Sequence, residues 1–277
     1  MDWLVELYGN HFLTFTLVLA RVTGLVVTAP LCSAIQAPKQ VRAVLALALA
    51  LVIAPTQIQL AAPSPRSLGE FALPLASELI VGAALGLGVS ILLGAAQIAG
   101  HLIAQISGLS AAQAFDPGMG GSVPLFSRLL GLFATAIYLT VGAHRWLISA
   151  LLETFTVMPV GAVRLTESIG ETLLSILSQS FSLGIRGAAP VVLTLLLATL
   201  LLGLIGRTLP QLNILALGFG MNAMVTFGML LVSLGTMAWL FQNELQPAIS
   251  AILESIARSA PAAGVIPAAA APYLTEF

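Results

Sequence analysis

Arg21 and Glu78 are the residues best placed to do chemistry, because each lies inside a long apolar stretch. Arg21 falls within the stretch from about Phe12 to Ile35, and Glu78 within the run from Phe71 to Gln105. A charge at the centre of a membrane span costs about 2.5 to 3.5 kcal/mol, so such a side chain must face protein or water. Two interpretations are open: an ion or proton relay, or an interhelical or intersubunit pair that holds an assembly together. We favour the pair, because a relay usually needs more than one carboxylate and the neighbouring segments contain no second acidic residue.

Other catalytic or metal-binding arrangements find little support in the sequence. His11, His101 and His144 are far apart, and none has a ligand-type neighbour three or four residues later, so we expect no metal site. A dyad of Ser107 or Ser110 with His144 is conceivable, but the spacing does not favour it. The motifs of nucleotide-binding loops, serine hydrolases and zinc proteases do not occur. We therefore expect neither an enzyme nor a bound cofactor.

The segment between Ser107 and Pro124 has a different character from the rest of the chain. Its sequence GLSAAQAFDPGMGGSVP contains four Gly and two Pro, together with Phe115 and Met119. Gly tolerates positive φ and Pro cannot continue a helix, which predicts a loop. Non-helical backbone at membrane depth is tolerated only where protein buries it or it lines a cavity. The segment is either a gate or plug or an ordinary exposed loop, and composition alone favours the ordinary loop.

Apolar stretches supply the elements that must position these residues. A helical span needs about 20 apolar residues, and the chain could supply roughly six such segments. They run over about residues 12–35, 43–55, 71–105, 126–155, 187–206 and 214–243. We expect a helical hairpin from the first two, and the third is too long for one simple upright span. Within it, Gly82 and Gly86 form a pair of small residues that permits close helix approach.

The C-terminal region predicts a second hairpin and a tail. Pro190 stands where the helix over Gly187–Gly206 could start, and Arg207–Asn213 turns the chain. After Glu244, residues 245–257 could form a short amphipathic helix. Residues 259–277 form a low-complexity tail that we expect to be disordered.

The overall composition argues against a soluble globule. Of the 277 residues, 58% are hydrophobic and 8% are charged, against about 25% charged in an ordinary soluble domain. Ten Lys and Arg against eleven Asp and Glu leave a net charge of -1, so no basic field is present to hold nucleic acid. The sequence thus predicts a single all-α membrane domain over residues 1–258.

Membrane orientation does not follow from the basic residues. In a six-segment scheme, the two sets of alternate connections carry four Lys or Arg each. One set is Lys39, Arg42, Arg128 and Arg207, and the other is Arg66, Arg145, Arg164 and Arg258. The sequence therefore predicts the apolar helices but not which of their ends faces which side of the bilayer.

Several motifs, in a fixed order, resemble the FliR family of flagellar type III export-gate membrane proteins. The first is LARVTGLVVTAP over residues 19–30, followed by VRAVLALALA from Val41. The others are FDPGMGGSVP over 115–124, GAHRWLISALLETF over 142–155 with MPVG after it, and PQLNILALGF over 210–219. The Asp-Pro after Phe115 and the PQLN motif look closer to the flagellar branch than to the injectisome branch of the family.

The resemblance implies a subunit that assembles with FliP and FliQ proteins into a pore for unfolded flagellar proteins. It implies a place in the flagellar basal body at the bacterial inner membrane, beside the FlhB-type and FlhA-type export proteins. The implied fold is a FliP-like part joined to a FliQ-like C-terminal hairpin, here about residues 187–241. An injectisome gate subunit is the main alternative, and a small-molecule transporter that uses Arg21 and Glu78 is a second one.

The resemblance also assigns residues to a plug and to a cytoplasmic turn. The plug corresponds to residues 108–124. With the resemblance, a gate is therefore favoured over the ordinary loop that composition alone favoured. Its central residues are Phe115, Asp116, Pro117, Gly118, Met119, Gly120 and Gly121. Phe115 and Met119 would supply apolar bulk across a narrow pore, and the glycines would let the segment move aside. The turn of the FliQ-like hairpin would contain Arg207, Pro210, Gln211 and Asn213.

Overall fold

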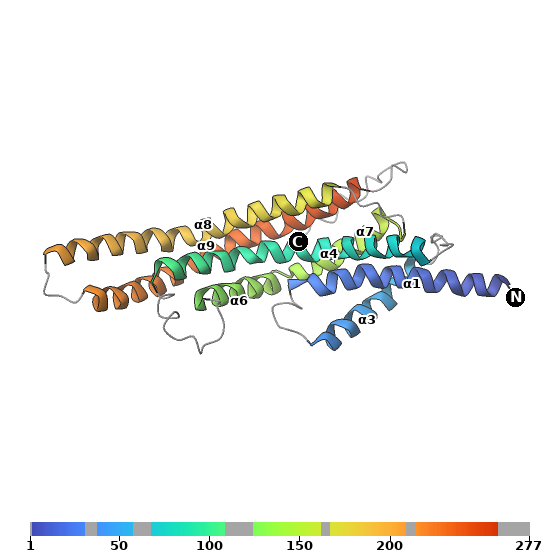
Figure 1. Cartoon of the computed structure of the whole chain (residues 1–277), viewed down its shortest axis with the longest axis horizontal. Helices are drawn as coiled ribbons and strands as arrows, with labels where there is room; N and C mark the ends of the chain where they lie inside the picture. The colour runs from blue at the N-terminus through green and yellow to red at the C-terminus, as the bar shows by residue number, and fades with distance from the viewer. Residues whose placement is uncertain are drawn as a thin grey trace.

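The structure is a computed structural model that describes residues 2–30, 38–57, 68–108, 124–161, 167–208 and 214–259. Every secondary-structure element in these ranges is an α-helix, which confirms the predicted fold class. The helices are α1 (Asp2–Thr28), α3 (Lys39–Gln57), α4 (Leu68–Ile106), α6 (Leu125–Thr140), α7 (Ala143–Val157), α8 (Glu167–Thr208) and α9 (Ile214–Arg258). Figure 1 shows that the longest of them run along one axis of an elongated bundle.

Helix α4 is the centre of this bundle. It contacts α1, α6, α7, α8 and α9, and Figure 1 shows it between α1 and the α8–α9 pair. Its 39 residues are apolar on all sides, as expected for a helix with neighbours all round. In its most apolar window 61% of the residues are buried, against 22% in α8, so α4 supplies the core and α8 much of the surface.

Helices α1 and α4 pack with their backbones in direct contact. A Cβ atom added to Gly82 would lie 1.8 Å from the carbonyl oxygen of Arg21, and one added to Gly24 would lie 2.2 Å from that of Leu79. The close approach predicted at Gly82 and Gly86 is thereby confirmed. Ser90 donates across the contact to the carbonyl of Thr28 at 2.6 Å, and the Thr28 hydroxyl lies 3.2 Å from the carbonyl of Ala83 and 2.8 Å from that of Gly24 in its own helix.

The single helix expected over residues 126–155 is wrong. The chain forms α6 and α7, which are bent by 66° relative to each other. The break lies at Gly142, whose φ of 76° is in the left-handed region. Only Gly adopts this conformation at little cost, so Gly142 allows the sharp change of direction.

The C-terminal hairpin is longer than the sequence indicated. Helix α8 runs for 42 residues with Pro190 in its interior, so the helix start expected at this proline is wrong. Helix α9 runs for 45 residues through Pro247 to Arg258, so residues 245–257 form no separate helix. Helices α8 and α9 lie side by side, and their facing ends extend beyond α4 at the left of Figure 1.

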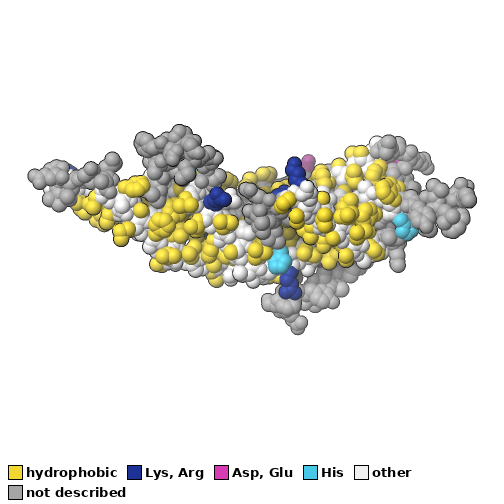
Figure 2. All heavy atoms as spheres, turned by 90° about the horizontal axis from the view of Figure 1, so that it is seen from below, with side chains coloured by type: hydrophobic (Ala, Val, Ile, Leu, Met, Phe, Trp, Pro, Cys, Tyr) yellow, Lys and Arg dark blue, Asp and Glu magenta, His cyan; other side chains and the backbone are white. Residues whose placement is uncertain are grey.

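The surface is that of a membrane protein. Among the residues that the structure describes, five helices are long and apolar enough to cross a bilayer, and the bent pair α6–α7 would be a sixth span. The face in Figure 2 is mostly apolar, with a few scattered basic and histidine side chains. This pattern agrees with a chain whose outer face contacts lipid or other apolar helices.

Candidate functional site

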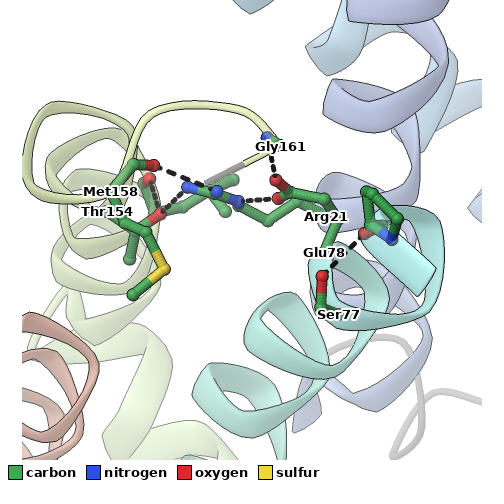
Figure 3. A network of polar contacts seen from close by, with 8 residues as sticks. Arg21, Ser77, Glu78, Thr154, Met158 and Gly161 are labelled. Carbon is green, nitrogen blue, oxygen red and sulfur yellow. Dashed lines mark hydrogen bonds and ion pairs between the residues drawn. The ribbon is translucent and has the colours of Figure 1, made fainter. Parts of the chain in front are cut away.

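Arg21 and Glu78 meet in the interior at the contact between α1 and α4. The Nε atom of Arg21 donates to Oε2 of Glu78 at 2.5 Å, and both side chains are 0% exposed. Figure 3 shows the two side chains pointing toward each other from the two helices. The two charges predicted from sequence therefore neutralise each other within one chain.

The rest of the Arg21 guanidinium binds α7 and the residue after it. One terminal nitrogen donates to the hydroxyl of Thr154 at 3.1 Å, and the other donates to the carbonyl of Met158 at 3.1 Å. The central carbon of the guanidinium lies 4.2 Å from the ring centroid of Phe155, in a cation–π contact. Arg21 thus holds the end of α7 against α1 (Figure 3).

Glu78 extends the same network into the turn that follows α7. Its Oε1 atom accepts a hydrogen bond from the backbone N–H of Gly161 at 2.8 Å. Gly161 has a φ of 81°, a conformation in which a side chain would be strained. The network joins α1, α4, α7 and this turn, and it supplies the extra hydrogen bonds that a buried ion pair needs to offset its loss of water.

Sequence reasoning found the two charges but not their other partners. Thr154, Phe155, Met158 and Gly161 lie more than 70 residues from Glu78 and carry no charge. Their one local signal is the Met-Pro-Val-Gly run after α7, in which Gly161 takes a positive φ. Arg21 and Glu78 are both bound to protein groups, and neither side chain lines the groove between α4, α6 and α8 or the hollow between α3 and α7.

The predicted plug and most of the predicted turn lie outside the described residues. This applies to Phe115, Asp116, Pro117, Gly118, Met119, Gly120 and Gly121, and to Pro210, Gln211 and Asn213. Arg207 is described and lies exposed in the last turn of α8. The tail predicted over residues 259–277 is described only at Ser259.

The two end residues of the predicted plug, Gly108 and Pro124, are described. Gly108 follows α4 with a φ of 75°, and Pro124 directly precedes α6. Pro124 lines a groove of about 600 Å³ between α4, α6 and α8, together with His101 and Phe181. Within the described ranges, no three or more His, Cys, Asp or Glu side chains come together as a metal site would require.

Comparison with known proteins gives a consistent result over most of the chain. The family model of bacterial export proteins, family 1, matches residues 12–248. The chain is 35% identical over 208 residues to the flagellar biosynthetic protein FliR of Escherichia coli (strain K12), covering 75% of this chain and 78% of that protein. It is 31% identical over 237 residues to FliR of Aquifex aeolicus, covering 86% and 91%. It is 28% identical over 228 residues to FliR of Caulobacter vibrioides, covering 82% and 91%.

Proposed function

The chain belongs to the bacterial export proteins, family 1, and from this membership we propose that it is a gate subunit of the flagellar type III export apparatus. The observation that carries the proposal is the family match over residues 12–248, which include nearly all of the helical bundle. The membrane-length helices agree with a membrane-embedded export component. Bacterial inner membrane and flagellar basal body are the corresponding location.

The gate would form by assembly with FliP-type and FliQ-type proteins. In this arrangement the FliQ-like hairpin is about residues 187–241, within α8 and α9, and the helices before it are the FliP-like part, with FlhB-type and FlhA-type proteins nearby. The apolar surface of the far half of the hairpin supports the proposal: Leu200 is 70% exposed and Met224 is 77% exposed. Apolar faces of this extent need lipid or neighbouring subunits to cover them.

Export would be controlled by steric closure of the pore. The plug, residues 108–124, begins two residues after the end of α4 and ends directly before α6, so the helices on both sides of it belong to the bundle. Phe115 and Met119 would fill a narrow pore with apolar bulk and exclude ions. Gly118, Gly120 and Gly121 would let the segment yield to an unfolded chain. The energy for export would come from other components of the apparatus.

The two alternatives have less support. An injectisome gate subunit would share this architecture, but the three relatives described above are flagellar proteins. A small-molecule transporter was suggested by Arg21 and Glu78, and these two side chains bind each other in the interior. We therefore propose protein export and not solute transport.

Co-purification tests the assembly. A tagged chain co-expressed with its FliP-type and FliQ-type partners should retain both of them through purification. Removal of residues 260–277 should leave the complex intact, whereas removal of residues 167–259 should lose the FliQ-type partner. A full-length chain that purifies alone while both partners are present in the same membranes would contradict the proposal.

Complementation separates the flagellar from the injectisome function. The chain, expressed with its own FliP-type and FliQ-type partners, should restore swimming to a flagellated strain that lacks these three proteins. Restored secretion of injectisome substrates without restored swimming would instead favour the injectisome function.

A further inference from the structure

The exposed surface of α4 becomes polar toward the C-terminal end of the helix. Between Val81 and Ile106 its exposed residues are Leu87, Gln97, His101 and Gln105. The last three are spaced four residues apart, so they lie on one face of the helix and extend over about 12 Å. These three residues are the polar stripe of α4.

The polar stripe differs from the exposed faces of the neighbouring helices. On α8 the exposed side chains between Leu193 and Ile205 are leucines and an isoleucine. Amide and imidazole groups that face hydrocarbon lose their hydrogen bonds to water, whereas leucine has none to lose. The polar stripe therefore faces water or the polar groups of another chain.

Two residues of the polar stripe line a groove. Gln97 and His101 belong to the groove of about 600 Å³ between α4, α6 and α8, whose other walls are mostly apolar and include the ring of Phe181. Ser127 and Ser180 also line it, and each donates its one hydroxyl hydrogen to a backbone carbonyl of α4 at 2.7 Å. The side-chain donors left for an occupant of the groove are those of Gln97 and His101.

The polar stripe offers both donors and acceptors. The amide nitrogen of Gln105 lies 3.3 Å from Nε2 of His101, and an amide nitrogen can only donate, so His101 accepts this bond and carries its own hydrogen on Nδ1. Gln105 keeps one N–H and its carbonyl oxygen. The Gln97 amide forms no hydrogen bond with the residues that the structure describes. Groups of both kinds can pair with the N–H and C=O of any peptide bond, whatever side chains the peptide carries.

We propose that the polar stripe lines the path of the exported polypeptide and forms hydrogen bonds with its backbone. The inference rests on the proposed export function. Exported proteins differ in sequence, but every unfolded chain carries the same backbone groups, and the apolar walls of the groove can contact its apolar side chains. Gln105 lies three residues before Gly108, where the proposed plug begins, so the stripe would lead to the plug. The three side chains carry no carboxylate or Lys or Arg charge that would hold a passing chain in place.

Disulfide crosslinking to a stalled substrate tests the contact. The chain carries Cys32→Ser, which removes its one cysteine, together with His101→Cys, and it is co-expressed with its FliP-type and FliQ-type partners. The substrate is a flagellar export protein that has cysteines in its unfolded segment and a stably folded domain fused to its C-terminal end. Oxidation should join the His101→Cys variant to this substrate. The Leu197→Cys variant, changed at a position of α8 that is 62% exposed, should not be joined to it.

The other outcomes separate the inference from the proposed function. If the substrate co-purifies with the complex and is joined to neither variant, or to both equally, the proposed path is wrong while the export function stands. If the His101→Cys variant is joined to a partner subunit with and without substrate, the polar stripe is an interface between subunits and the inference is overturned. If the complex that contains the unchanged chain retains no substrate, the export function fails, and the inference fails with it.

Removal of the hydrogen-bonding groups tests their part in export. Gln97→Leu combined with His101→Leu should lower the amount of secreted substrate about fivefold, as expected for the loss of one hydrogen bond. Gln40→Leu, at an exposed position of α3, should leave secretion unchanged, and His101→Gln should keep it because an amide also donates and accepts. Unchanged secretion by the double variant would overturn the proposal. Loss of the FliP-type or FliQ-type partner from its complex would also overturn it, because the stripe would then bind a subunit.

Discussion

Arg21 binds protein through all three of its guanidinium nitrogens, which explains how a charge is accommodated in this interior. Nε binds the opposite charge of Glu78, and the other two nitrogens bind oxygen atoms of Thr154 and Met158. A buried pair without such additional bonds would not recover its cost of desolvation. The network is therefore best understood as a structural connection between helices.

Loss of one charge should destabilise the fold more than loss of both. Arg21→Met leaves the Glu78 carboxylate buried without a cation, and removal of one partner of a buried pair typically costs about 3 to 5 kcal/mol. Arg21→Met combined with Glu78→Leu removes both charges and should cost less than the sum of the two single changes. Thermal unfolding in detergent, followed by circular dichroism, measures the three variants. Additive losses would show that the two side chains are not coupled.

Gly161 should resist even the smallest side chain. Its φ of 81° makes an alanine strained by about 1 to 2 kcal/mol, and its N–H holds Glu78. Gly161→Ala should lower the unfolding temperature. Gly170→Ala, in the first turns of α8 with open space around it, should leave that temperature unchanged or raise it slightly. Equal unfolding temperatures for the two variants would contradict the role given to this turn.

At the scale of the elements, the close contact between α1 and α4 depends on glycines, which have no side chain to keep the two helices apart. Gly82→Ala places a methyl group 1.8 Å from the backbone oxygen of Arg21, so the helices must separate at a cost of at least about 1 to 3 kcal/mol. Gly94→Ala, on the same helix, adds a methyl group where nothing lies within 4 Å. The yield of folded protein from membranes should fall for the first variant only. A fall of similar size for both variants would argue against close packing at Gly82.

The sequence predicted the helices better than their ends. Hydropathy depends on residue composition alone, so the existence of the long apolar elements and the all-α class could be predicted. The break at Gly142 and the uninterrupted course of α8 through Pro190 depend on tertiary packing, which no local pattern records. Within the network, Arg21 and Glu78 stood out because charge is rare in apolar stretches. Thr154 and Met158 could not be recognised in this way, because uncharged residues are common in apolar stretches.

At the scale of the whole molecule, the plug proposal predicts a change in permeability. Deletion of residues 115–121 removes Phe115 and Met119 and should make membranes that contain the assembled complex leaky to small ions. Deletion of seven residues from the tail, 267–273, should leave conductance unchanged. Planar-bilayer recordings of purified complexes measure both variants. Unaltered conductance of an intact complex with the first deletion would show that these residues close no pore.

The exposed far half of α8 and α9 also constrains how the protein is made. Leucine, methionine and phenylalanine side chains cover these helix ends on the outside, and the described part of the hairpin has one charged residue, Arg207, between Gly187 and Asn243. A finished chain released into water would present this surface to other chains and aggregate. The hairpin therefore needs lipid or neighbouring protein to cover it from the time it leaves the ribosome.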